Sequence, residues 1–250
     1  MELLKDSLYV VHNNCVFKSD LNGKNIQRLL SPKEKKEIEW IDGIKIYNNE
    51  IYLLAEGDGD TIFRFYPESK KIEKIAEDIR NSCFSGNNLY YIEHGEVGIN
   101  KVDLRTRKGK IVRGQAWKNK LQYEDNIVRY KGIVENQGEV FYICRGEDGK
   151  VRLYQYRDHK KDKIQHGFSD NSYEFVYNSS MIVGYNTHWD SSEKRYLQIY
   201  HLDSEQEQKI KIPNNDWYAL LVVDDLLFCG YPDDKDDFYH MLKIHKLLDN

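Results

Sequence analysis

Four tryptophans lie in or beside polar connecting segments of the chain rather than inside its apolar runs: Trp40, Trp117, Trp189 and Trp217. Tryptophan stacks well on sugar faces and on cations, and it is the residue most enriched at binding hot spots. These residues therefore favour non-covalent recognition as the chemistry of the protein. For Trp40 and Trp217, which border predicted strands, the competing interpretation is a structural plug between neighbouring sheets.

Three histidines, His12, His94 and His188, follow predicted strands in different parts of the chain. Histidines on one rim can converge on a ligand or a metal ion, although scattered loop histidines are the commoner case. The eight histidines include no HxH or HxxxH pair. We therefore keep the three as candidate binding residues, and we predict no metal site and no cofactor.

Carboxylates are concentrated in the run from Glu56 to Thr61, in which aspartate alternates with glycine. Alternating carboxylates can present oxygens to one Ca²⁺ ion, but the spacing of an EF-hand loop and its distal glutamate are missing here. We therefore predict a solvated hairpin loop. The chain also lacks the GxSxG, HExxH, phosphate-binding-loop and CxxC patterns, so no catalytic residue is predicted.

These candidates are positioned by a unit that returns six times at a spacing of about 45 residues. Each unit contains an apolar, tyrosine-rich run and then a second strand-like run, as in residues 51–54 and 62–65. Several strands in a repeat of this length predict an all-β fold, a six-bladed β-propeller of mostly four-stranded antiparallel blades. The units lie at about residues 1–32, 40–78, 80–114, 126–167, 172–213 and 217–250 of a single domain.

The four strands of a unit, A to D in chain order, differ in composition. Asn48-Asn49 is predicted to join strands A and B of the second unit, because asparagine tolerates the left-handed conformations of tight hairpins. The D strands alternate charged and apolar residues, as an exposed sheet edge requires. The first and last blades are incomplete: Met1 to Lys5 is all that can serve as the first inner strand, and the last unit has no fourth strand.

The segment from Val16 to Leu29, VFKSDLNGKNIQRL, resembles the strand C to strand D segment of YWTD-type propellers. These are the low-density-lipoprotein-receptor type and similar bacterial domains of unknown function. Ile99 to Leu104 repeats the pattern, and Leu89 to Ile92 is similar to the strand B of that family. No YWTD tetrapeptide is present, so the resemblance implies a six-bladed binding propeller and assigns no site residue.

In a propeller, the D–A and B–C connections open on one face, which maps all four tryptophans to that face. The B–C loops are rich in Asp and Glu, whereas the opposite C–D turns carry lysine and arginine, for example at Lys70, Lys71, Arg105 and Arg107. We therefore expect non-enzymatic binding of a protein or peptide on the acidic, tryptophan-bearing face. The alternatives are binding of a carbohydrate or cell-surface polymer there, and a hydrolase or lyase at a central pocket.

Composition sets the remaining expectations. A net charge of −4 is too small to indicate nucleic acid, no apolar stretch is long enough for a membrane span, and a monomer is expected. Cys15, Cys83, Cys144 and Cys229 fall in different units and are predicted to be reduced. The protein is expected to be cytoplasmic if the chain is complete, and secreted or surface-attached if an N-terminal signal was trimmed.

Overall fold

The computed structural model describes residues 1–56, 60–95, 98–113, 129–146, 148–158, 160, 162–168, 174–185, 196–211, 218–223, 226–233 and 236–246. The described residues form antiparallel sheets and one short 3-10 helix, η1 (Pro32–Glu34). The chain divides into two compact units, Met1–Arg113 and Gly114–Asn250, which are considered one at a time. No helix among the described residues is long and apolar enough to cross a membrane.

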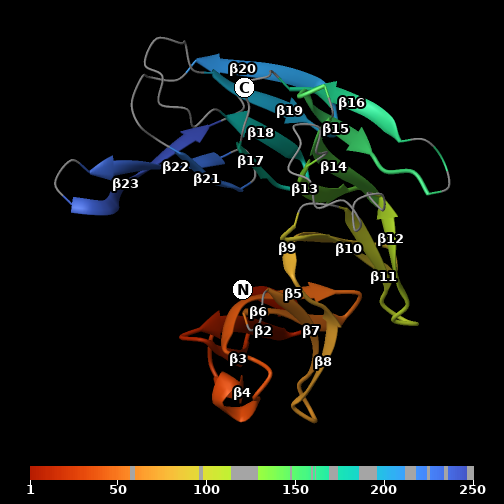
Figure 1. The fold of residues 1–250 in the computed structure, drawn as a ribbon. Helices are drawn as coiled ribbons and strands as arrows, with labels where there is room; N and C mark the ends of the chain where they lie inside the picture. Colours follow the sequence, from red (N-terminus) through yellow and green to blue (C-terminus); the bar gives the residue numbers. More distant parts are fainter. Residues whose placement is uncertain are drawn as a thin grey trace. The chain divides into compact units, whose positions relative to one another are not determined.

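The first compact unit contains three four-stranded sheets (Figure 1). Their strands are β1 (Glu2–Leu4), β2 (Ser7–His12), β3 (Cys15–Asp20) and β4 (Gln27–Leu30); β5 (Trp40–Tyr47), β6 (Glu50–Glu56), β7 (Thr61–Tyr66) and β8 (Lys71–Ala76); and β9 (Ile79–Ser85), β10 (Asn88–Glu93), β11 (Ile99–Asp103) and β12 (Gly109–Arg113). Within each sheet, strands adjacent in sequence are adjacent in space, so every sheet is a simple meander.

The second compact unit contains two four-stranded sheets and one of three strands among its described residues. Their strands are β13 (Arg129–Asn136), β14 (Glu139–Arg145), β15 (Val151–Gln155) and β16 (Lys163–Gly167); β17 (Glu174–Tyr177), β18 (Met181–Tyr185), β19 (Tyr196–His201) and β20 (Gln206–Lys211); and β21 (Tyr218–Val223), β22 (Leu226–Asp233) and β23 (Asp236–Lys246). Each sheet again follows the chain order.

The turns within the sheets form where the sequence predicts them. Asn48 and Asn49 join β5 to β6 with φ values of 49° and 60°, in the left-handed region. Asn13 and Asn14 join β2 to β3 in the same way, with φ values of 45° and 61°. Two successive residues with positive φ match the right-handed twist of the flanking strands, which explains the asparagines at these positions.

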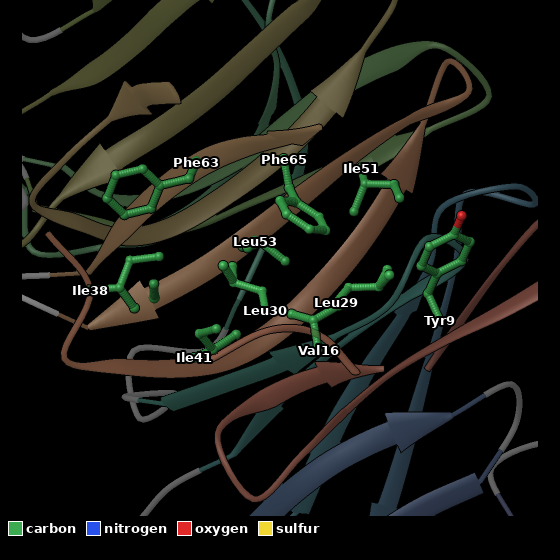
Figure 2. Packing of buried hydrophobic residues seen from close by; sticks show 11 residues of the cluster. Tyr9, Val16, Leu29, Leu30, Ile38, Ile41, Ile51, Leu53, Phe63 and Phe65 are labelled. Atoms are coloured by element: carbon green, nitrogen blue, oxygen red, sulfur yellow. The ribbon is translucent and has the colours of Figure 1, made fainter. Parts of the chain in front are cut away.

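The hydrophobic core of the first two sheets consists of residues from both, shown in Figure 2. Val16, Leu30, Leu53 and Ala55 are completely buried within it. A second cluster joins the sheet β5–β8 to the sheet β9–β12 around Tyr52 and Leu89. In the second compact unit, a third cluster joins β13–β16 to β17–β20. Apolar side chains on strand faces therefore pack consecutive sheets against one another, as blades do.

Several sequence expectations are confirmed at this level. Residues Glu2–Leu4 form β1 and pair with β2, and the D strands β4, β8, β12, β16 and β20 lie at sheet edges. The sheet of β21–β23 has no fourth strand among its described residues. Cys15, Cys83 and Cys144 form no disulfide among the described residues. The side chain of Cys229 lies outside the described residues, and a single six-bladed domain stays a prediction.

Candidate functional site

A bulge in strand β5 places an extra acidic residue at one end of the second sheet. The pairing of β5 with β6 shifts register between Ile41 and Gly43, so Asp42 has no residue opposite it. Similar shifts occur near the same end of β13 and β21. An unpaired bulge residue bends its strand and changes the direction of its side chain. The bulge thereby sends Asp42 away from the alternating pattern of the rest of β5.

Three carboxylates converge at this end of the sheet. Asp42 comes from the bulge, Glu56 is the last residue of β6, and Asp60 directly precedes β7. One oxygen from each of the three lies within 4.8 Å of the others. Asp42 and Glu56 are exposed and Asp60 is partly buried. Glu56 and Asp60 of the acidic run therefore lie close to a third carboxylate, that of Asp42, which is not part of this run in the sequence.

Trp40 lies beside this group, as the first residue of β5 and the residue opposite Glu56. Half of its surface, 50%, is exposed. A plug between sheets would be expected to lose nearly all of its exposed surface, so the observed exposure favours the recognition interpretation for Trp40. The backbone here is held in place because the Glu39 N–H donates to the Glu56 carbonyl at 3.0 Å.

His94 approaches the acidic group from the next sheet. Its Nε2 lies 3.7 Å from Oδ2 of Asp60, and its side chain is about half exposed. Two main-chain hydrogen bonds hold the segments together: the His94 N–H donates to the Asp78 carbonyl at 3.1 Å, and the Ile79 N–H donates to the Asp60 carbonyl at 2.8 Å. The structure therefore places two of the residues predicted from sequence next to members of this group, Trp40 opposite Glu56 and His94 near Asp60.

The electrostatics of the group favour a cationic partner. The pKa of Asp42 is raised above its ordinary value, first by partial burial and then by the negative charge of Asp60. A cation that approaches such a group relieves the repulsion between its carboxylates. Three carboxylate oxygens can contribute to a site for a hard cation, although Ca²⁺ takes six or more oxygen ligands. A lysine or arginine side chain of a binding partner would satisfy the same charge.

The other predicted site residues are not part of this group. His12 is exposed at the end of β2, next to the turn of Asn13 and Asn14. Trp117, Trp189, Trp217 and His188 lie outside the described residues, so the convergence of the four tryptophans stays a prediction. Sequence reasoning missed Asp42, because nothing in the repeat pattern indicated a bulge at this position. The only signal in the sequence is a charged residue between Ile41 and Gly43 in a largely apolar run.

Comparison with known proteins finds similarity in structure alone. No protein family matches the chain in sequence, and no curated protein does. The computationally designed protein Ika8 is similar with a TM-score of 0.53 and 14% identity, over 98% of this chain and 70% of the other. The N-terminal domain of Nup159 has a TM-score of 0.51 and 8% identity, over 96% and 71% of the two chains. Nidogen, from its complex with laminin, has 0.50 and 11%, over 90% and 85%.

Nup159 and nidogen are β-propellers, and the antiparallel sheets of this chain have the same architecture. The fold is therefore a β-propeller fold. At these identities the likeness concerns the fold alone, and no residue or activity is transferred from either protein.

Proposed function

We propose that the protein is a six-bladed, non-enzymatic binding propeller that recognises a protein or peptide through an acidic tryptophan surface. This surface consists of Trp40, Asp42, Glu56 and Asp60. Six blades are supported by the six repeats and by the resemblance of residues 16–29 to YWTD-type propellers. The single observation that carries the function is the half-exposed Trp40 beside three converging carboxylates.

The physical argument combines an apolar anchor with charge. A half-exposed tryptophan on a strand costs little conformational entropy when it is covered, because the β scaffold already holds it. Adjacent carboxylates attract lysine or arginine and exclude acidic partners. We therefore expect a linear or loop segment that carries an aromatic or aliphatic residue close to a basic one.

A display library of linear peptides, screened in parallel with a glycan array, tests this function. Peptides enriched on the intact protein should carry basic and apolar residues. Replacement of the central anchor, Trp40→Ala, should weaken their binding by about 30-fold, which corresponds to about 2 kcal/mol. Leu21→Ala is the matched control, because Leu21 is 57% exposed and is not part of the acidic tryptophan surface. It lies in the turn between β3 and β4 of the first sheet.

A second pair of variants isolates the contribution of charge. Glu56→Gln removes one carboxylate from the surface, whereas Glu68→Gln removes an exposed carboxylate from the turn between β7 and β8. Only Glu56→Gln should weaken the peptides and reduce the dependence of their affinity on salt. The proposal is refuted if enriched peptides bind the Trp40→Ala protein as tightly as the wild type. Binding to glycans alone would instead favour the carbohydrate alternative.

A further inference from the structure

A crevice of about 450 Å³ lies between the first two sheets, at the end of β6 remote from the acidic tryptophan surface. β6 begins at this crevice with Glu50 and ends at the acidic surface with Glu56. Its lining includes Lys5, Tyr9, Lys18, Arg64, Phe65 and Glu68. Its volume is within the range of pockets that hold small ligands.

The inner part of this crevice is apolar and fixed in position. Tyr9, Ile51 and Phe65 are 5%, 2% and 2% exposed, and all three belong to the core cluster of the first two sheets. They therefore cannot move without disturbing the packing between the sheets. A flat apolar group placed in the crevice would contact a preformed surface.

One of the cations of the crevice is already neutralised. Arg64 forms an ion pair with Glu50, and its guanidinium carbon lies 5.2 Å from the centre of the Tyr66 ring. Glu50 also accepts a hydrogen bond of 2.8 Å from the hydroxyl of Tyr52. Both oxygens of Glu50 are thereby engaged, so this carboxylate is not free to compensate other cations nearby.

The two lysines of the crevice have no such partner. The ammonium of Lys18 lies 5.8 Å from the centre of the Tyr9 ring. It forms no ion pair with a carboxylate among the described residues. Lys5 likewise has no ion pair or hydrogen bond of its side chain within the described part of the chain. The remaining acid, Glu68, is exposed. Two ammonium groups that form no ion pair among the described residues thus lie at this crevice, and even with Glu68 counted its lining carries more cations than acids, opposite in sign to the acidic tryptophan surface.

An equivalent crevice in the second compact unit shows what the same place looks like without this feature. It lies between the sheets β13–β16 and β17–β20 and has a volume of about 270 Å³. Pairing registers make Phe141 and Gln155 the counterparts of Tyr9 and Lys18. Gln155 accepts a hydrogen bond of 3.0 Å from Gln165, so it is satisfied within its own sheet.

Side-chain hydrogen bonds also join the two sheets at this second crevice. The amides of Asn136 and Gln137 donate to Oδ1 of Asp203 at 2.9 and 2.8 Å. By pairing register, Gln137 is the counterpart of Lys5 and Asp203 the counterpart of Glu68, but no hydrogen bond or ion pair joins Lys5 to Glu68 among the described residues. The polar groups therefore satisfy one another in the second crevice, whereas the lysines of the first are left available.

We propose that the crevice between the first two sheets binds a small organic anion, in which Lys18 and Lys5 meet the charge and Tyr9 and Phe65 contact an apolar body. An ammonium group is a compact point charge that pairs with either carboxylate or phosphate, so the shared chemistry is an anionic group on a small apolar or aromatic frame. This site is separate from the acidic tryptophan surface and does not depend on the function proposed for it.

The test uses the full chain and three probes of similar frame: benzoate, phenyl phosphate and benzyl alcohol. Binding is followed by the shifts of backbone amide signals in two-dimensional NMR. Benzoate or phenyl phosphate should give saturable shifts in the residues that line the crevice, and neutral benzyl alcohol should not. Whichever anion binds more tightly identifies carboxylate or phosphate as the preferred group.

Three variants connect the binding to the lysines. Lys18→Met keeps an apolar stem over Tyr9 and removes the charge, so it should weaken anion binding by about tenfold. Lys5→Met should weaken it in the same direction, and it serves if Lys18→Met does not fold. Lys33→Met is the control, because Lys33 is an exposed lysine that does not line the crevice, and it should leave affinity unchanged.

Two results would overturn the proposal. The first is the absence of saturable shifts with both anions, or equal binding of benzyl alcohol. The second is an unchanged affinity in Lys18→Met and Lys5→Met, since the charge would then play no part.

Discussion

Two adjacent leucines in β6 provide a direct test of how this strand is placed. Leu53 is completely buried in the core cluster of the first two sheets, and Figure 2 shows it among Leu30, Phe65 and Ile41. Its neighbour Leu54 is 38% exposed. Successive residues of a strand point to opposite faces, so the same substitution should have very different effects at these two positions.

The magnitudes follow from burial. Leu53→Ala removes a fully buried side chain and leaves a cavity in a packed core, which typically costs about 3–5 kcal/mol. Leu54→Ala removes a side chain that is already more than one-third in solvent, and its cost should be about 1 kcal/mol or less. For a chain of this size each kcal/mol lowers the melting temperature by about 2–4 °C. We therefore expect losses of about 6–20 °C for Leu53→Ala and at most about 4 °C for Leu54→Ala.

Thermal unfolding monitored by circular dichroism, with urea unfolding as an independent measure, gives both values. The lower strand propensity of alanine affects both variants alike, so it cancels in the comparison. Equal destabilisation, or a larger loss for Leu54→Ala, would refute the register given for β6. A shift of one residue exchanges the two faces of the strand and would produce that reversal.

Three further predictions concern ionisable groups. Burial and a neighbouring carboxylate raise the pKa of Asp42, so its charged form opposes folding. Asp42→Asn should therefore raise the stability of the fold at neutral pH by about 0.5 kcal/mol or less. In paired thermal melts across pH, this gain should vanish as acid protonates the wild-type residue. Burial lowers the pKa of His166 below its ordinary value of 6.5, so folding favours the neutral ring. The stability of the fold should therefore fall as pH decreases below that value, and His166→Gln should reduce this loss. An unchanged pH profile in the variant would contradict the burial of the ring. The hydroxyl of buried Tyr142 donates to Oδ2 of Asp162 at 2.6 Å, so Tyr142→Phe should cost about 1–3 kcal/mol in urea unfolding, and a cost near zero would show that the hydrogen bond contributes nothing.

The sequence by itself determined the strands and their order within each sheet. Turn chemistry and apolar alternation are local properties, so the asparagine pair at Asn48-Asn49 and the tyrosine-rich runs could be read without knowledge of distant contacts. The charge of the D strands also marked them as edges, because an edge must resist pairing with other chains. These local signals return in every unit, which is why the propeller fold could be predicted.

Only the tertiary structure decided which side chains meet. The bulge at Asp42 arises from a mismatch of pairing between two strands, and nothing near it in sequence brings Asp42 to Asp60. The exposure of Trp40 depends in the same way on what neighbouring segments cover. Among the described residues Lys18 forms no ion pair or hydrogen bond, whereas the equivalent Gln155 accepts a hydrogen bond from Gln165, and this difference also depends on the neighbouring strands and sheets. Contacts between strands and between sheets join residues far apart in the chain, so repeat pattern and composition predict the scaffold but not the site.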